Sequence, residues 1–300
     1  MDELLQLVQQ PQQAGLAART LFTTLKDWRQ RQSADAWRRW VAGDPHVSPL
    51  RRFAHQCPIS ARNFYKPRGY AGDAATLDLI YGLAGTPAER GNPVALVTSA
   101  APAARAVRFR RAVLAQAIDE ACLLAGPRSA RLLSVACGHL REIELSTHAR
   151  AGDFDTFVAM DQDVESLRTL QADYGTLGIQ ACPASVRDLL KGRVAPILQS
   201  PPFDLIYAAG LYDYLDEEAA RALTAMLFSR LKPGGRLLVA NFMPDLPDSA
   251  YMEAMMDWWL IYRSDDDMRR LAPPGAAGIR LFHDPDHAIV FMDLLAAHGD

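Results

Sequence analysis

Hydrophobic residues in the first third of the chain recur at helical spacing. Over residues 1–82 they follow an i, i+3, i+4 pattern, with no alternation typical of strands. A stretch rich in Pro, Gly and Ala, residues 85–104, interrupts this pattern, and helical spacing resumes over residues 105–124. The pattern predicts a helical N-terminal domain over residues 1–104 and a second domain over residues 105–300.

Short apolar runs alternate with helical stretches in the second part. The runs cover residues 131–136, 156–160, 178–182, 203–208 and 236–241. Strands that alternate with helices predict an α/β fold in which a mostly parallel sheet carries helices on both faces. Two final runs, residues 279–283 and 288–294, flank an Asp-Pro-Asp turn. They predict a hairpin and therefore an antiparallel last strand.

Composition narrows the classes of protein. The chain has 300 residues, of which 49% are hydrophobic and 22% are charged, so it can bury a large core and is expected to be globular. Its net charge of -3 provides no general basic surface for nucleic acid. A small-molecule substrate is therefore expected. The oligomeric state is left open, with a homodimer as one option.

The four cysteines indicate neither a metal site nor disulfide bonds. Cys57, Cys122, Cys137 and Cys182 lie far apart and lack the paired spacing of zinc ligands. The N-terminal residues are acidic and Gln-rich, unlike a signal peptide. No stretch approaches the roughly 20 apolar residues of a membrane span. We expect a reduced, cytoplasmic protein with no bound metal and no membrane span.

The most informative segment is residues 132–144, an apolar strand that enters a turn at Gly138 and is expected to continue as an amphipathic helix. Ligands of open α/β sheets bind beyond the carboxyl ends of the strands, where glycine permits close approach. Asp161 ends the next strand and can accept hydrogen bonds from both hydroxyls of a ribose. Leu140 stands where a dinucleotide site would have a second glycine, which argues against NAD. S-adenosylmethionine (SAM) carries no phosphate, so one glycine suffices.

Two later segments, residues 203–215 and 231–239, extend the pattern. Residues 108–300 resemble the class I SAM-dependent methyltransferases, which have a Rossmann-like fold. The resemblance implies that the cofactor site contains Ala136, Gly138, Asp161, Gln162, Ser185, Val186 and Gly210. Tyr70, from the N-terminal part of the chain, is counted with these cofactor-binding candidates. Within the site, Ala136 and Gly138 would contact the methionine part, Asp161 the ribose, and Gln162 the adenine. Ser185 stands where the family commonly has an Asp at the adenine amine. Each residue also has a structural explanation: Asp161, for example, could cap the helix that begins near Val164.

Residues 61–74 concentrate aromatic side chains, cations, two glycines and an acid around Pro67, which prevents a continuous helix. Such density suggests a site, and Arg68 can hold a carboxylate through two hydrogen bonds. A solvated loop with local aromatic packing is the structural alternative. The same alternatives apply to residues 258–263, where Trp259 and Tyr262 lie three apart on an expected helix.

Residues 66–73, 210–215 and 260–263 together resemble the bacterial methyltransferases that make 3-hydroxy fatty acid methyl ester quorum signals. The resemblance implies methyl transfer to a carboxylate, with the helical segment as a lid over the SAM pocket. A carboxylate acceptor is already ionised and needs no base. Arg68 or Arg263 is the candidate carboxylate ligand, and Tyr65, Tyr70 and Tyr212 would shape the pocket; Tyr65 and Tyr212 are counted with the arginines as catalytic candidates.

Two alternatives stay open for the function. One is other SAM chemistry in a natural-product pathway, either N-methylation or cyclisation of SAM with release of methylthioadenosine. His139 could act as a base for an amine or hydroxyl acceptor, although a turn residue at that place is more often structural. The other is a SAM-binding regulatory protein without catalysis.

Overall fold

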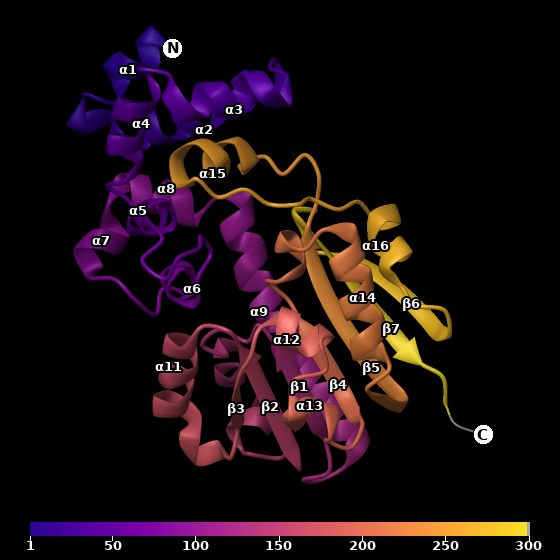
Figure 1. Ribbon diagram of the computed structural model, residues 1–300. Coiled ribbons are helices and arrows are strands. Elements are labelled where there is room, and N and C mark those ends of the chain that lie inside the picture. The colour runs from indigo at the N-terminus through magenta and orange to yellow at the C-terminus, as the bar shows by residue number, and fades with distance from the viewer. Residues whose placement is uncertain (299–300) are drawn as a thin grey trace. The chain divides into compact units, whose positions relative to one another are not determined.

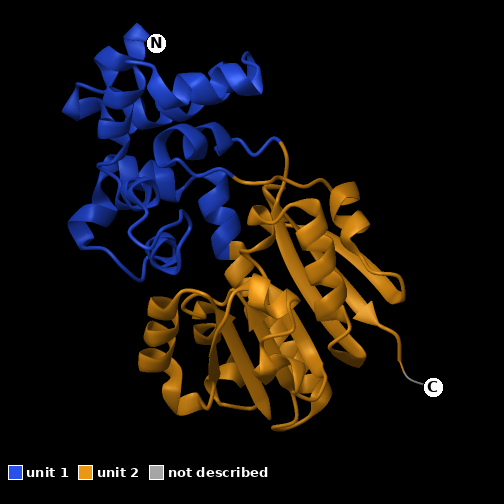
Figure 2. Cartoon of the chain, viewed as in Figure 1, with its two compact units in different colours: residues 1–108, 245–259 blue, residues 109–244, 260–300 orange. Residues whose placement is uncertain are grey.

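The computed structural model describes residues 1–298 (Figure 1). The chain divides into two compact units: Met1–Arg108 with Asp245–Trp259, and Phe109–Pro244 with Leu260–Asp300 (Figure 2). The division falls inside the long helix α9 (Pro102–Ala125), slightly later than the expected position at residue 104. The first unit also takes residues 245–259, which the sequence pattern had left in the second domain.

The first unit is entirely helical. Side chains that accept hydrogen bonds from the first turn begin several of its helices, as Ser33 does for α3 and Asn92 for α8. The elements are α1 (Asp2–Leu7), η1 (Pro11–Gln13), α2 (Ala14–Gln30), α3 (Ala34–Gly43), α4 (Val47–Ala54), α5 (Pro58–Tyr65), α6 (Ala74–Tyr81), α7 (Pro87–Gly91), α8 (Pro93–Ser99), the first part of α9, and α15 (Ser249–Met256).

Helix α15 belongs to this unit because its side chains complete the core of the N-terminal helices. The ring of Tyr251 stacks on Phe22 with the ring centroids 3.9 Å apart. The buried carboxylate of Glu253 accepts hydrogen bonds from Trp37 Nε1 (2.6 Å) and Arg29 Nε (3.0 Å). These contacts join residues more than 200 positions apart, which local periodicity does not report.

The second unit contains one seven-stranded sheet in the order β3-β2-β1-β4-β5-β7-β6. The strands are β1 (Arg131–Val135), β2 (Thr156–Asp161), β3 (Gln180–Pro183), β4 (Phe203–Ala208), β5 (Leu231–Phe242), β6 (Ala276–His283) and β7 (Ile289–Ala296). Strands β1 to β5 pair in parallel, whereas β7 runs antiparallel to both β5 and β6. The expected α/β class, the mostly parallel sheet and the reversed last strand are confirmed.

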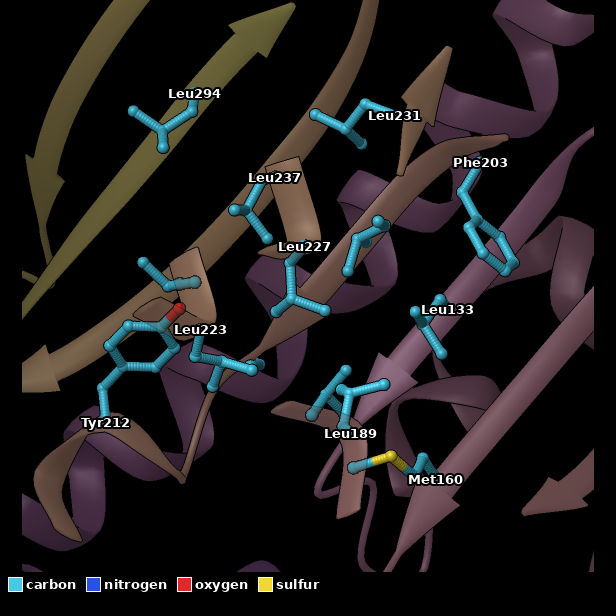
Figure 3. Close-up of a cluster of buried hydrophobic side chains, with 14 of the residues drawn as sticks. Leu133, Met160, Leu189, Phe203, Tyr212, Leu223, Leu227, Leu231, Leu237 and Leu294 are labelled. Carbon is cyan, nitrogen blue, oxygen red and sulfur yellow. The ribbon is translucent and has the colours of Figure 1, made fainter. Parts of the chain in front are cut away.

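Helices connect and cover these strands. They are η2 (Arg141–Glu144), α10 (Thr147–Arg150), α11 (Val164–Tyr174), η3 (Gly175–Leu177), α12 (Val186–Leu190), α13 (Ala195–Leu198), η4 (Tyr212–Tyr214), α14 (Glu217–Phe228) and α16 (Asp265–Leu271). A buried cluster joins strand residues such as Leu133 and Leu237 to Leu189 of α12 and Leu223 of α14 (Figure 3). Since this burial removes apolar surface from water, it is the main force that holds the helices on the sheet.

Two expected helices are wrong. The turn at Gly138 leads only into the short η2 and α10, because Leu140 adopts a left-handed conformation (φ 56°) that a continuous helix does not allow. Residues 258–263 are not helical either. There the backbone N–H groups of Ile261 and Arg263 donate to the carbonyls of Asp213 (2.8 Å) and Phe242 (3.0 Å).

Within residues 1–298, no helix is both long enough and apolar enough to be a candidate membrane span.

Candidate functional site

The turn after β1 contains three residues in the left-handed region: Ala136 (φ 55°), Gly138 (φ 56°) and Leu140 (φ 56°). Glycine adopts this conformation without strain, whereas for Ala and Leu it costs about 1–2 kcal/mol each. The N–H of Cys137 donates to the carbonyl of Met160 (3.0 Å) and so fastens the turn to β2. Strain held at the carboxyl end of a central strand is typical of a functional turn.

Asp161, the last residue of β2, lies directly against this turn. Its Oδ2 accepts a hydrogen bond from the Gly138 N–H (2.8 Å), and its Oδ1 accepts one from the Asp163 N–H (2.8 Å). Asp161 is only 6% exposed, and burial raises the pKa of its carboxyl group although both hydrogen bonds act to lower it. Asp161 does not cap α11, since Asp163 accepts the bond from Glu165 N. The structure thus brings Gly138 and Asp161 together.

These two residues lie where the strand order of the sheet reverses. The chain proceeds outward from β1 through β2 to β3 and then returns to β4 on the other side of β1. The carboxyl ends of β1 and β4 therefore lie at this reversal, where open α/β sheets usually bind their ligands. Gly210 follows β4 at the same edge. A side chain there would come within 3.4 Å of Arg110 Nη2, while Arg110 Nη1 donates to the carbonyl of Ala209 (2.6 Å).

The loop after β3 carries Ser185 and Val186. The hydroxyl of Ser185 donates to Asp188 Oδ2 (2.6 Å) and accepts from Asp188 N (3.1 Å), so Ser185 caps α12. Val186 begins that helix and packs against the buried cluster. The Ala184 N–H donates to the carbonyl of Asp161 (3.0 Å), which holds this loop next to β2. Gln162 is exposed beside the same strand end. Adenine binding by Ser185, Val186 and Gln162 stays a prediction.

Two further groups near this turn, Glu142 and Tyr207, were not predicted from the sequence. Glu142 of η2 is 7% exposed, and its Oε1 accepts a hydrogen bond from the hydroxyl of Tyr207 on β4 (2.7 Å). Burial raises the pKa of both groups. Glu142 lies four residues after Gly138, and this spacing was the feature of the sequence from which it could have been predicted. His139, also in the turn, is 5% exposed.

Tyr212 and Arg263, two of the predicted catalytic residues, have hydrogen-bond partners within the second unit. Tyr212 is fully buried within the hydrophobic cluster, and its hydroxyl lies 2.9 Å from Thr224 Oγ1 (Figure 3). Arg263 Nη1 donates to the Tyr212 carbonyl (2.6 Å) and to Asn241 Oδ1 (2.7 Å), and Nη2 donates to the Leu215 carbonyl (2.5 Å). Its guanidinium group therefore ties the segments after β4 and β5 together, which weakens its candidacy as a substrate ligand.

Asp213, next to Tyr212, was not singled out from the sequence. This residue is 3% exposed, and its Oδ1 accepts a hydrogen bond from the Phe242 N–H (2.7 Å). Burial raises the pKa of this carboxyl group to about 6, although the Phe242 N–H and the charges of Arg110 and Arg263 oppose the shift. A strongly perturbed carboxyl group after a central strand is a candidate functional group. Its position in the segment 210–215, directly after β4, was the feature of the sequence from which it could have been predicted.

Residues 66–73 in the helical unit form a loop that is fastened at its base. The Gly72 N–H donates to Asn63 Oδ1 (2.6 Å), and Arg62 donates to the buried Asp73 through Nε (2.8 Å) and Nη2 (2.6 Å). Burial acts to raise the pKa of Asp73, but the bonds from Arg62 and Thr76 lower it on balance. Arg62 and Asn63, which contact the loop from α5, were not predicted from the sequence to have these roles.

Within this loop region the three candidate side chains differ in exposure. Tyr65 ends α5 and is 70% exposed, while Arg68 and Tyr70 are partly buried. Their predicted roles at the acceptor and at the cofactor stay predictions.

Comparison with solved structures places this geometry in a known fold. A possible exported protein from Bordetella parapertussis aligns over 75% of this chain and 79% of its own, with a TM-score of 0.60 and 18% identity. Magnesium protoporphyrin IX methyltransferase from Synechocystis PCC 6803, solved with bound S-adenosylhomocysteine, aligns over 79% and 98%, with a TM-score of 0.52 and 12% identity. The fold is that of a class I methyltransferase. No family profile and no curated protein matches the sequence significantly.

Proposed function

We propose that this protein is an enzyme that transfers the methyl group of SAM to a small-molecule carboxylate and so forms a methyl ester. The observation that carries the proposal is the strained turn after β1, in which the Gly138 N–H is held by Asp161 where the strand order reverses. The similarity to a methyltransferase fold supports it.

The residues of this turn fit the nucleoside part of SAM. Each carboxylate oxygen of Asp161 accepts one backbone N–H, and a carboxylate oxygen can accept a further hydrogen bond. Two ribose hydroxyls can therefore be added without breaking the contacts of the turn. Gly138 leaves room for the methionine part, and Gln162 and Val186 are proposed to flank the adenine. When bound, SAM supplies an electrophilic methyl group on a sulfonium.

For the acceptor, the protein has to position an oxygen in line with the methyl group and exclude water. We propose that Arg68 holds the acceptor carboxylate, with Tyr65 and Tyr70 beside it. Arg263 is not included, because its guanidinium group already donates to three oxygens. The loop that carries Arg68 is ordered by Asn63 and Arg62, and such preorganisation favours a binding role.

A hydroxy fatty acid is the first acceptor to test, since the sequence resembles methyltransferases of 3-hydroxy fatty acid quorum signals. We propose a cytoplasmic setting for this reaction, in keeping with the four cysteines of the chain, all of which are free thiols.

The test is incubation of the full chain with SAM labelled in the methyl group and a panel of acids, amines and alcohols, followed by mass spectrometry. A labelled methyl ester supports the proposal. A labelled amine, or release of methylthioadenosine, would replace it with other SAM chemistry. Binding of S-adenosylhomocysteine in calorimetry, with no product from any acceptor, would favour a regulatory protein. Asp161→Ala serves as the control for product formation at this site.

A further inference from the structure

The helical unit contains a cavity of about 350 Å³. The first turn of α5, the end of α6, and helices α7 to α9 line it. Its apolar wall includes Ile59, Leu79, Ile80, Ala95 and Leu96. The volume lies within the range of small-molecule sites. None of the residues proposed above to bind SAM or the acceptor lines this cavity.

Arg108 of α9 lines the same cavity, and its hydrogen bonds within the described chain go to uncharged groups. Its Nη1 donates to the Ile80 carbonyl (3.1 Å) and its Nη2 to the Ser99 carbonyl (2.7 Å), both of them neutral acceptors. Burial lowers the pKa of Arg108, and within residues 1–298 the charge that affects it is that of Arg105, another cation. A partly buried cation that no carboxylate compensates favours an anion beside it.

The other charged side chains of the cavity, Glu89 and Arg90, do not compensate Arg108. Glu89 Oε2 accepts a hydrogen bond from the Thr86 N–H (2.7 Å) and so completes the capping box of α7. Arg90 Nη1 donates to the Gly85 carbonyl (2.5 Å). Since this neighbouring pair is of opposite sign, the balance of charge around the cavity is positive.

We propose that this cavity binds an amphiphilic anion, whose apolar body fills the wall of Ile59, Leu79 and Leu96 and whose acidic head pairs with Arg108. At about 30 Å³ for each water-sized group, the volume admits roughly a dozen non-hydrogen atoms. This site goes beyond the proposed methyl transfer, because binding there requires neither SAM nor an acceptor at the sheet.

The test uses decanoate, a molecule of the required size and charge, with the full chain in the absence of SAM. Calorimetry below the micelle concentration is expected to show saturable binding of decanoate with one site per chain. 1-Decanol and decyltrimethylammonium share the apolar body but lack the negative charge, so they are expected to bind at least about tenfold more weakly. Similar binding of all three would overturn the assignment of an anion site, as would no binding of decanoate.

Two pairs of variants locate the site. Arg108→Gln removes the charge and is expected to weaken decanoate binding about tenfold or more, whereas Arg39→Gln removes an exposed charge elsewhere in the unit and should leave it unchanged. Leu96 is 57% exposed and Leu16 is 48% exposed, so Leu96→Asp and Leu16→Asp both should fold. Only Leu96→Asp places a repelling carboxylate at the cavity, with an expected loss of about threefold or more.

Circular dichroism checks that each variant is folded. If Arg108→Gln proves unfolded, the Leu96 and Leu16 pair decides alone. Equal affinities for the two members of a pair of folded variants would overturn the proposal. Since decanoate binding is measured without SAM, failure here leaves the methyl-transfer proposal untouched, and failure to find methyl transfer leaves this site untouched.

Discussion

Replacement of Asp213 by asparagine should stabilise the protein at neutral pH. Asp213 is 3% exposed, and the Phe242 N–H is the hydrogen-bond donor to its carboxyl group within the described residues. Burial raises its pKa from 3.8 to about 6 in the folded state. The folded protein therefore binds the proton of Asp213 more tightly than the unfolded chain does. The stability that the folded protein has while Asp213 is protonated is fully present below about pH 4. It is lost as the pH rises through about 6, because the buried carboxyl group then has to become charged.

A shift of about two pKa units corresponds to about 3 kcal/mol at pH values above both pKa values. The asparagine side chain would be neutral at every pH, and its oxygen could still accept from the Phe242 N–H. The stability gained by Asp213→Asn is thus expected to grow from about 0.5 kcal/mol near pH 4 to about 3 kcal/mol above pH 7. The charges of Arg110 and Arg263 are already included, since they act on the same pKa.

Urea unfolding of the wild type and Asp213→Asn at half-unit intervals from pH 4 to pH 8 measures this difference. Glu218→Gln, at an exposed position of the same unit, is the control and should show no such trend. A difference that stays constant with pH, or a variant less stable than the wild type at pH 8, would refute the reasoning. A gain in stability together with a loss of turnover would identify Asp213 as a functional residue, because active sites often retain destabilising groups.

Four further substitutions test the site. Asp161→Ala should weaken SAM binding by about 1–3 kcal/mol in calorimetry, since it removes the ribose acceptor and frees the Gly138 N–H; unchanged affinity would remove Asp161 from the site. Gly138→Val should abolish binding, because a branched residue at φ 56° is strained and fills the methionine space; normal affinity would mean that the cofactor binds elsewhere. Arg68→Lys should lower turnover about tenfold or more while the fold is retained, and near-normal turnover would leave only a charge effect. Arg263→Lys should lower the free energy of unfolding, measured by urea denaturation, by about 2–4 kcal/mol, because three hydrogen bonds, two of them buried, are disturbed; an unchanged value would show that lysine can replace them.

The sequence by itself determined the fold class and the centre of the predicted cofactor site. Apolar runs such as residues 203–208 reveal strands, because burial of a strand between helices requires a continuous apolar stretch, and this information is local. The pairing of Gly138 with Asp161 also follows from local order. Gly138 follows β1 and Asp161 ends β2. These strands are consecutive and parallel, so their carboxyl ends lie at the same edge of the sheet.

Only the tertiary structure decided which polar residues have structural partners. Arg263 was a candidate carboxylate ligand because it lies in the segment 260–263 that resembles the family, but its side chain donates to residues from 22 to 51 positions away. Residues 258–263 have helical spacing, yet the N–H groups of Ile261 and Arg263 donate to the carbonyls of Asp213 after β4 and of Phe242 in β5. Arg108 likewise becomes a candidate ligand only because five helices place it in the lining of one cavity. Burial and hydrogen-bond partners depend on distant segments, and a pattern read over neighbouring residues does not contain them.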